Sequence, residues 1–153
     1  MSSRASVSRS QTLPLLPCTC ANLRRAARAV TRLYNRQLRR DGIEITQFTL
    51  LMTLDRTGEI TQGKLGKVLA LDSTTLTRML EPLKKRGWIQ EKEGDDRRFR
   101  IIRLTEAGRG KLRRSMPRWK AAQDRLQSAL GEETMDQLGR LLLQVASILS
   151  TDR

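Results

Sequence analysis

The chain has 153 residues and no histidine, and its 30 lysines and arginines against 16 acidic residues give a formal net charge of +14 at pH 7. The length suits one domain, and the absence of histidine, of a Gly-rich phosphate loop and of paired carboxylates on an apolar face argues against an enzyme, a metal site and a cofactor. No apolar run approaches the ~20 residues of a membrane-spanning helix, and no apolar segment follows Arg4 and Arg9, so we expect a cytoplasmic protein with no membrane partner.

The N-terminal region divides into a basic arm and a helix. Residues 1–18 are rich in serine and contain two prolines, so we expect a flexible basic arm there. Residues 19–45 contain a predicted helix from about residue 19 to residue 40, which Asp41-Gly42 ends. Its apolar face consists of Leu23, Ala26, Ala27, Val30, Leu33, Tyr34 and Leu38.

Residues 46–104 begin with two further helices. Thr46 is a suitable N-cap for a helix that extends to about Arg56, with Ile45 and Leu50 at the positions of a hydrophobic staple. The side chains expected to face inward from it are Phe48, Leu51 and Met52. Thr61 is the predicted N-cap of a short helix to about residue 70. The side chains of this helix that we expect to pack against the next one are Leu65, Val68 and Leu69.

The next predicted helix has an apolar face and a polar face suited to DNA. Its apolar stripe recurs at i, i+3, i+4 and i+7 and consists of Leu76, Met79, Leu80 and Leu83. Thr74 and Arg78 point away from this stripe, and a hydroxyl beside an arginine suits base edges and phosphates in a major groove. Asp72 or Ser73 can cap the start and Gly87 the end, while Pro82 should kink or loosen the last turns. The spacing therefore predicts a recognition helix.

A β-hairpin is predicted directly after this helix. Its strand-like runs are residues 88–93 and 99–104, and residues 94–98 form the turn. Arg97 and Arg98 lie at the tip, where a basic loop can enter a narrow minor groove. The plain alternative is that the helix stripe is ordinary core and that these arginines only keep a hairpin soluble. Helix, hairpin and spacing together favour a basic wing.

At this point the sequence resembles the MarR family of winged helix-turn-helix regulators. The pattern Asp-x-Arg, a strand and Leu-Thr-x-x-Gly occurs here as Asp96-Arg97-Arg98 followed by residues 99–103 and Leu104-Thr105-Glu106-Ala107-Gly108. The resemblance extends from about Leu23 to the end of the chain. It implies that Arg98 pairs with Asp96 and lies near the DNA backbone or minor groove.

The C-terminal region, residues 105–153, contains two predicted helices. Thr105 caps a long helix through Trp119 toward Leu130, which Pro117 should bend or interrupt. The last helix, residues 132–150, has a wide apolar stripe formed by Met135, Leu138, Leu141, Leu142, Val145, Ile148 and Leu149. Such a stripe either completes the monomer's own core or covers a second copy, and a two-fold mate would present two recognition helices to half-sites one turn apart. The MarR resemblance implies a dimer built from the first and the last two helices.

The charge distribution supports a DNA partner. Residues 1–40 hold nine basic residues and no acidic one, and residues 72–118 hold fourteen basic against seven acidic residues. The excess thus lies at the N-terminal region and around the proposed recognition helix, as expected of a phosphate-binding surface.

The combined prediction is a mainly α fold with a small β-hairpin wing and with dimerisation helices at both ends. We expect a homodimeric, sequence-specific transcriptional regulator, a repressor at a pseudo-palindromic operator in double-stranded DNA. The alternative is a winged-helix module that binds RNA or protein. The residues expected to read bases are Thr74, Thr75 and Arg78, with Ser73 and Thr77 beside them. The residues expected to contact phosphates are Thr61, Gln62, Lys64 and Lys84. The wing should contact DNA through Arg97 and Arg98.

Two cysteines raise the question of a signal. Cys20 should lie in the first turn of a helix with Arg24 one turn further on, and both effects favour the reactive thiolate. Cys20 and Tyr34 also resemble the peroxidatic cysteine and a neighbouring tyrosine of the organic-hydroperoxide-responsive branch of the MarR family, with Cys18 as a further thiol. The alternative to redox sensing is that Cys18 and Cys20 are only small residues at the start of a helix. The second candidate signal is a small aromatic acid bound between the dimer helices and the DNA-reading part. Its carboxylate could be held by Arg24, Arg25 or Arg28.

Overall fold

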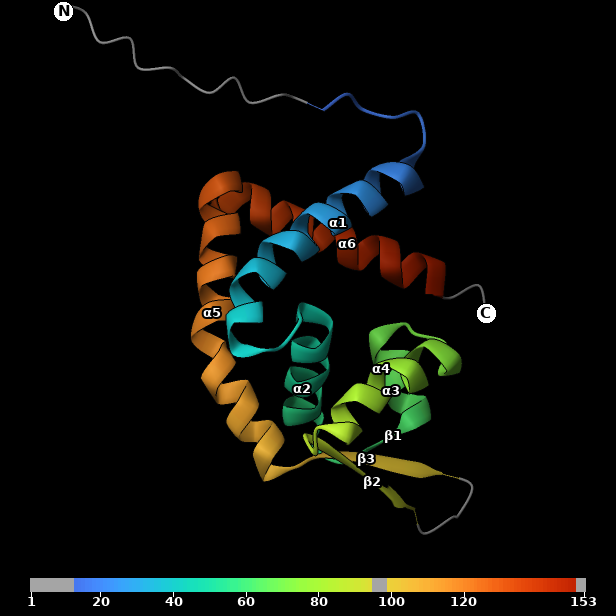
Figure 1. Cartoon of the computed structure of the whole chain (residues 1–153). Coiled ribbons are helices and arrows are strands. Elements are labelled where there is room, and N and C mark those ends of the chain that lie inside the picture. The colour runs from blue at the N-terminus through green and yellow to red at the C-terminus, as the bar shows by residue number, and fades with distance from the viewer. Residues whose placement is uncertain (1–12, 95–98, 151–153) are drawn as a thin grey trace, which may run out of the picture.

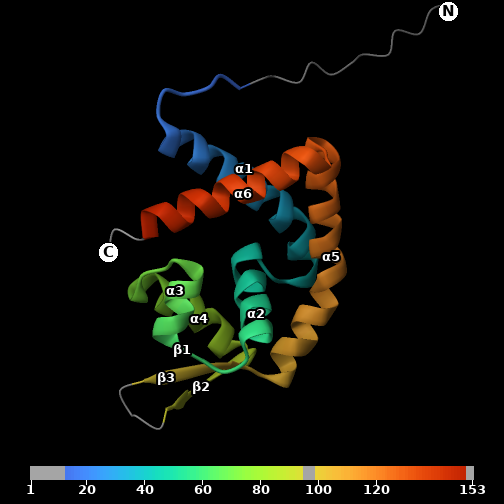
Figure 2. The same cartoon turned by 180° about the vertical axis from the view of Figure 1, so that it is seen from behind.

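The computed structural model describes residues 13–94 and 99–150 and shows a mainly helical molecule with one small sheet (Figure 1). Helices α1 (Thr19–Leu38), α5 (Glu106–Leu130) and α6 (Glu132–Ser150) form a helical layer, in which α5 extends along one side from the end of β3 to the start of α6 (Figure 2). The reading head, which we define as residues 60–104, lies beside the start of α5, and α2 (Ile45–Thr57) lies between the reading head and helices α1 and α6 (Figure 1). The predicted fold class is therefore confirmed.

The α1–α2 junction differs from the prediction in one detail. A short 3-10 turn, η1 (Arg39–Asp41), follows α1, and Gly42 ends it in the left-handed region at φ +67°. The N-cap of α2 is Glu44 rather than Thr46, because the Glu44 carboxylate accepts the Gln47 backbone N–H and the Gln47 side chain accepts the Glu44 N–H. Ile45 is consequently inside the helix, so the predicted Ile45–Leu50 staple is wrong.

Two short helices form the helix-turn-helix pair. The Thr61 hydroxyl caps α3 (Gln62–Leu69) by accepting the Lys64 N–H at 3.3 Å, and the Asp72 carboxylate caps α4 (Ser73–Lys85) by accepting the Thr75 N–H at 2.8 Å. Leu65 is fully buried, as predicted, but Val68 is 58 % exposed. The face of α3 that packs inward centres on Leu65, Gly66 and Leu69, and the helical turn carries Val68 away from it.

Gly66 shows how closely α3 packs. A Cβ at this position would lie 3.0 Å from the Leu71 carbonyl oxygen and 3.6 Å from the Leu76 side chain. The absence of a side chain therefore lets the α3 backbone approach the turn before α4 closely, and this close approach sets the distance between the two helices.

The wing is part of a three-stranded antiparallel sheet. The strands β1 (Ile60–Thr61), β2 (Ile89–Glu93) and β3 (Arg100–Leu104) are ordered β1-β3-β2, with Ile60 and Glu91 both opposite Ile102. The two predicted strands are confirmed. The two-residue strand β1 was not predicted, because two residues carry no alternation signal.

The two prolines predicted to disturb helices lie inside continuous helices. Pro82 lies within α4 and Pro117 within α5, so neither proline interrupts its helix, and Figure 1 shows α5 as a curved helix. The Thr105 hydroxyl caps α5 as predicted, accepting the Gly108 N–H at 3.0 Å. At Gly108 a Cβ would lie 2.1 Å from the Trp88 carbonyl oxygen, so this glycine allows α5 to begin directly against the base of the wing.

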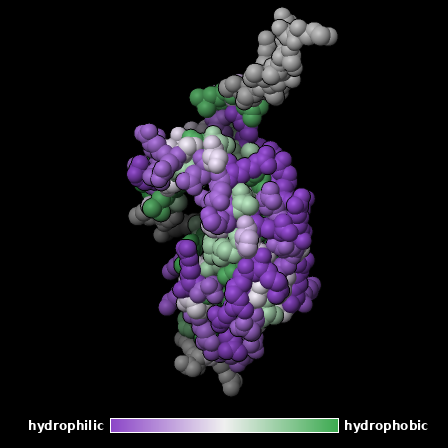
Figure 3. Space-filling model, turned by 90° about the vertical axis from the view of Figure 1, so that its left-hand side faces the viewer, coloured by the Kyte–Doolittle hydropathy of each residue, from purple (hydrophilic) through white to green (hydrophobic). Residues whose placement is uncertain are grey.

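The core lies between α2, the reading head and α5. Phe48 stacks on Trp119 of α5 with ring centroids 5.9 Å apart, while α4 contributes Leu76, Leu80 and Leu83. The outer face along α5 is predominantly hydrophilic (Figure 3). Among the described residues, no helix combines the length and apolar character needed to cross a membrane.

Candidate nucleic-acid interface

The exposed face of α4 carries the residues best placed to meet a ligand of the reading head. Ser73, Thr74 and Arg78 are exposed, on the side opposite the buried leucine stripe, as the spacing predicted. Within the described part of the chain, Arg78 has no acidic partner, so its five N–H donors are available. This face can offer a hydroxyl and a guanidinium to one groove of a duplex.

The remaining hydroxyls of α4 are already engaged. The Thr75 hydroxyl donates to Asp72 Oδ2 at 2.6 Å, and this bond, with that from the Thr75 backbone N–H, lowers the pKa of Asp72. The Thr77 hydroxyl donates to the Ser73 carbonyl and accepts from Gln62 Nε2, both at 2.8 Å. Thr75 and Thr77 therefore hold the start of α4 in place, and Gln62 ties α3 to α4.

The N-terminal end of α3 lies beside this face. Lys64 is exposed, and Thr61 and Gln62 are half-buried at the first turn. Backbone N–H groups of a first helical turn that are not capped, as the Lys64 N–H is by Thr61, can meet a phosphate. The structure thus brings together the residues predicted from α3 and from the start of α4.

Lys84 is not part of that group. It lies ten residues after Thr74, about 15 Å along the helix axis. Its ammonium pairs with Glu91 of β2, which also accepts Arg100 Nη1 at 2.5 Å. The bonds from Lys84 and then Arg100 lower the pKa of Glu91. Lys84 therefore joins the end of α4 to the wing.

The predicted wing-tip residues Asp96, Arg97 and Arg98 lie outside the described residues. The strands below it are held by charge pairs on the solvent side. Lys92 Nζ lies 2.6 Å from a carboxylate oxygen of Glu59, and Arg103 Nη1 lies 3.5 Å from the other. Lys92 is the main cause of the lowered pKa of Glu59.

The two cysteines are exposed at the start of α1. Cys18 is the N-cap residue and Cys20 the second residue of the helix, with Arg24 exposed one turn on, as predicted. Tyr34 is buried, its hydroxyl donates to Gln123 Oε1, and burial raises its pKa. Because fourteen residues of helix separate Cys20 from Tyr34, about 21 Å, the structure does not bring them together within one protomer. The described residues contain no cluster of metal ligands.

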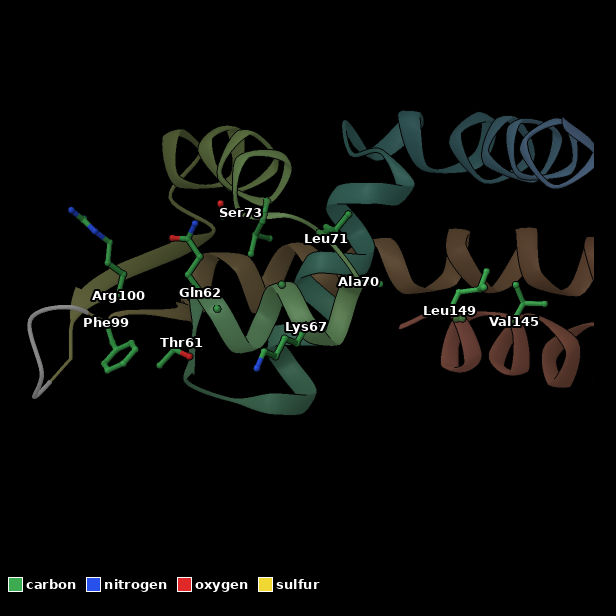
Figure 4. Close-up of a pocket in the computed structure, with 14 residues that line it drawn as sticks. Thr61, Gln62, Lys67, Ala70, Leu71, Ser73, Phe99, Arg100, Val145 and Leu149 are labelled. Carbon is green, nitrogen blue, oxygen red and sulfur yellow. The ribbon is translucent and has the colours of Figure 1, made fainter. Parts of the chain in front are cut away.

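A long cleft of about 1090 Å³ extends from the reading head to α6 (Figure 4). Gln62, Phe99 and Arg100 lie toward one end, and Val145 and Leu149 of α6 lie at the other. Lys67 and Arg100 are its cationic residues, whereas Arg24, Arg25 and Arg28 do not line it. Lys67 and Phe99 were not predicted as site residues, because Lys67 belongs to no motif and Phe99 was assigned only to a strand of the hairpin.

Several exposed large apolar side chains of the described residues lie together on the stripe of α6. Met135 and Leu138 are half-buried, but the C-terminal part of the stripe is exposed, at Leu141, Leu142, Val145, Ile148 and Leu149. The stripe therefore does not complete the core of the monomer, which was the alternative to a partner.

Comparison with known proteins gives a consistent picture. The MarR family model matches residues 43–99. The transcriptional repressor MprA of Escherichia coli K12 is 36 % identical over 118 residues, which is 75 % of this chain and 67 % of MprA. The multiple antibiotic resistance protein MarR of Salmonella typhimurium is 40 % identical over 78 residues, 50 % of this chain and 54 % of MarR.

Two solved structures with DNA have the same fold. The Mycobacterium tuberculosis transcriptional regulator MosR in complex with DNA superposes with a TM-score of 0.81 at 30 % identity, covering 89 % of this chain and 98 % of MosR. A mutant of E. coli MarR in complex with operator DNA superposes with a TM-score of 0.75 at 26 % identity, covering 82 % of this chain and 91 % of MarR.

Proposed function

The chain belongs to the MarR family, and from this premise we propose that it is a DNA-binding transcriptional regulator that represses from a pseudo-palindromic operator in double-stranded DNA. One observation carries the proposal: α4 presents Thr74 and Arg78, unpaired and exposed, in a winged-helix frame that superposes on two regulators bound to DNA. A regulator of this kind acts where the chromosome is, in the cytoplasm. The family consists of regulators rather than enzymes.

The contacts divide by chemistry. We assign base readout to Thr74 and Arg78 with Ser73 beside them, since these groups are exposed and free to meet a base edge. Thr75 and Thr77 support that face through their bonds to Asp72, Ser73 and Gln62. Phosphates are assigned to Thr61, Gln62 and Lys64 at the start of α3, and Arg97 and Arg98 to the wing, with Asp96 orienting it.

The assembly that fits this role is a homodimer. The exposed leucines of α6 need a cover, and a second copy of the same helical layer supplies one of matching character. Two-fold symmetry would then place one α4 over each half-site.

Two signals are supported by different observations. The cleft between α3, β3 and α6 has an apolar end and the cations Lys67 and Arg100, which suits a small aromatic acid. Gln62 and Ser73 line both this cleft and the proposed DNA face, so an acid bound there would interfere with DNA directly. Exposure of Cys20 in the first turn of α1 supports oxidation by a peroxide.

The test of the function uses the full chain in competition. A fluorescent duplex, recovered by selection from a random DNA pool, is bound by the protein and challenged with unlabelled duplex or with a structured RNA. We expect the duplex of the same sequence to displace the label and the RNA to do so only at far higher concentration. Displacement by the RNA at equal or lower concentration would favour the alternative, an RNA-binding winged helix.

A further inference from the structure

A polar cluster joins the helical layer to the reading head at a place that the DNA contacts do not use. Asp41, in the turn between α1 and α2, accepts Arg118 Nε of α5 at Oδ1, at 2.8 Å. Lys111 of α5 donates its ammonium to the backbone carbonyl of the same Asp41. Two side chains on one face of α5, two helical turns apart, thus hold one residue of the α1–α2 turn.

The same cluster reaches the base of the wing. Lys111 Nζ lies 5.1 Å from the centroid of the Trp88 ring, and the Arg86 guanidinium carbon lies 4.8 Å from it. Arg86 Nη1 also donates to the Gly42 carbonyl at 2.7 Å, so the end of α4 is tied to the α1–α2 turn. We call Asp41, Arg86, Trp88, Lys111 and Arg118 the polar latch.

Arg86 is exposed, but the Asp41 end of the latch is partly enclosed. The side chain of Asp41 is 21 % exposed, and its Oδ2 is one of only two buried side-chain polar atoms without a protein hydrogen-bond partner among the described residues. The other is Oγ of Ser115, which lies between Lys111 and Arg118 on the same face of α5. Burial is also the main cause of the lowered pKa of Lys111.

Such a cluster has a specific use. An apolar contact would hold α5 against the reading head in many orientations, whereas a charged and hydrogen-bonded contact is satisfied in few, so its contribution lies in orientation more than in net stability. Trp88 connects α5 to the wing, because its carbonyl accepts the Thr105 N–H at 3.0 Å at the start of α5 and the next residue begins β2.

We propose that the polar latch sets the angle between the reading head and the helical layer, and thereby the half-site spacing that the dimer accepts. The proposal rests on the proposed function, since spacing has meaning only for a dimer on a two-fold operator. Recognition helices of such a dimer must meet half-sites about 34 Å apart, so a change of angle at the base of each head changes the separation that fits. Asp41, Lys111 and Arg118 are then positioning residues that touch no DNA.

The test measures spacing preference separately from half-site affinity. Full-length protein is titrated on the selected operator and on duplexes in which the same half-sites are moved together or apart by one and two base pairs. The variants are Asp41→Asn and, as an independent route to the same change, Lys111→Met, which keeps an unbranched aliphatic side chain but removes the ammonium that contacts Asp41 and Trp88. The control is Asp124→Asn, which removes an exposed pair with Lys120 on the same helix.

We expect wild type and Asp124→Asn to prefer one spacing by about tenfold in Kd, and the latch variants to lose most of that preference while a single half-site is bound unchanged. Circular dichroism identifies any variant that does not fold, and the folded one then decides. An unchanged spacing preference in a folded latch variant would overturn the proposal. If the wild type itself bound every sequence equally, the failure would be that of the proposed function and not of the latch.

Discussion

At the scale of single residues, the polar side chains of α4 differ in what they are free to do. Thr75 and Thr77 have their hydroxyl protons committed to Asp72 and Ser73, whereas Arg78 has no acidic partner in the described part of the chain. The sequence spacing predicted that Thr75, Thr77 and Arg78 lie on or beside one face of the helix. It could not predict which hydroxyls already donate a hydrogen bond within the protein, because such bonds depend on side-chain rotamers.

Arg78→Ala should therefore cost about 1–3 kcal/mol on the selected operator and relax the sequence preference locally, because a bidentate contact to one base pair is lost. Anisotropy on the operator and on duplexes substituted one base pair at a time measures both effects. Arg125→Ala, an exposed arginine on α5, is the matched control. Equal loss on operator and random DNA would show that Arg78 holds a phosphate instead.

Cys20 gives a second prediction at this scale. An organic hydroperoxide should release wild-type protein from the operator and leave Cys20→Ser bound, since oxidation requires the exposed thiol. Anisotropy before and after peroxide, and again after a thiol reductant, measures release and its reversal. Release of both proteins, or of neither, would remove Cys20 from the account and leave the acid in the cleft as the candidate signal.

Among the helices and strands, the start of a helix was predicted correctly where its N-cap is a short polar residue. Thr61, Asp72 and Thr105 are short polar residues before apolar runs, and each caps the helix that was predicted for it. Glu44 was missed because a long carboxylate in the N-cap position is uncommon and Thr46 offered the usual pattern two residues later. Pro82 and Pro117 lie inside helices because packing on neighbouring elements outweighs the lost bond.

The join between α4 and the wing should depend on pH. Glu91 has a folded pKa below its ordinary value of 4.5. Its ionised form therefore stabilises the protein fully above that value, and the contribution is lost as the pH falls through the folded pKa. Glu91→Gln should reduce the free energy of unfolding by about 1–2 kcal/mol at pH 7. This value lies between those typical of exposed and of buried salt bridges.

Urea unfolding of wild type and Glu91→Gln from pH 7 to pH 3 measures this difference, which should shrink below about pH 4.5. Glu81→Gln is the matched control, because the pair of Glu81 with Lys85 is largely exposed and should contribute little at any pH. A difference that stayed constant or grew on acidification would mean that Glu91 does not act through its charge.

At the scale of the whole molecule, the sequence predicted the apolar stripe of α6 but not the features between distant segments. The cleft combines α3, β3 and α6, and the polar latch combines residues 41, 86, 88, 111 and 118. No periodicity links such positions, because their proximity follows from how the helices pack and not from local spacing.

The dimer is tested on α6 itself. Leu142→Asp places a charge on the exposed apolar face and should weaken self-association at least about tenfold, because a carboxylate would be buried in an apolar interface. Ser147→Asp adds the same charge on the opposite side of the helix and serves as the control. Sedimentation equilibrium reports the mass against the 17.5 kDa of one chain. A wild type that stays at the monomer mass at micromolar concentration would contradict the dimer.

Sequence-specific DNA binding is decided by the Kd of the wild-type protein for the selected operator and for a scrambled duplex of the same length, over a range of salt concentrations. We expect log Kd to change linearly with log salt on both duplexes and the operator to be bound at least about 10³ times more tightly. Equal affinity for the two duplexes would mean that the protein holds phosphates without reading bases, and that it is not a sequence-specific regulator.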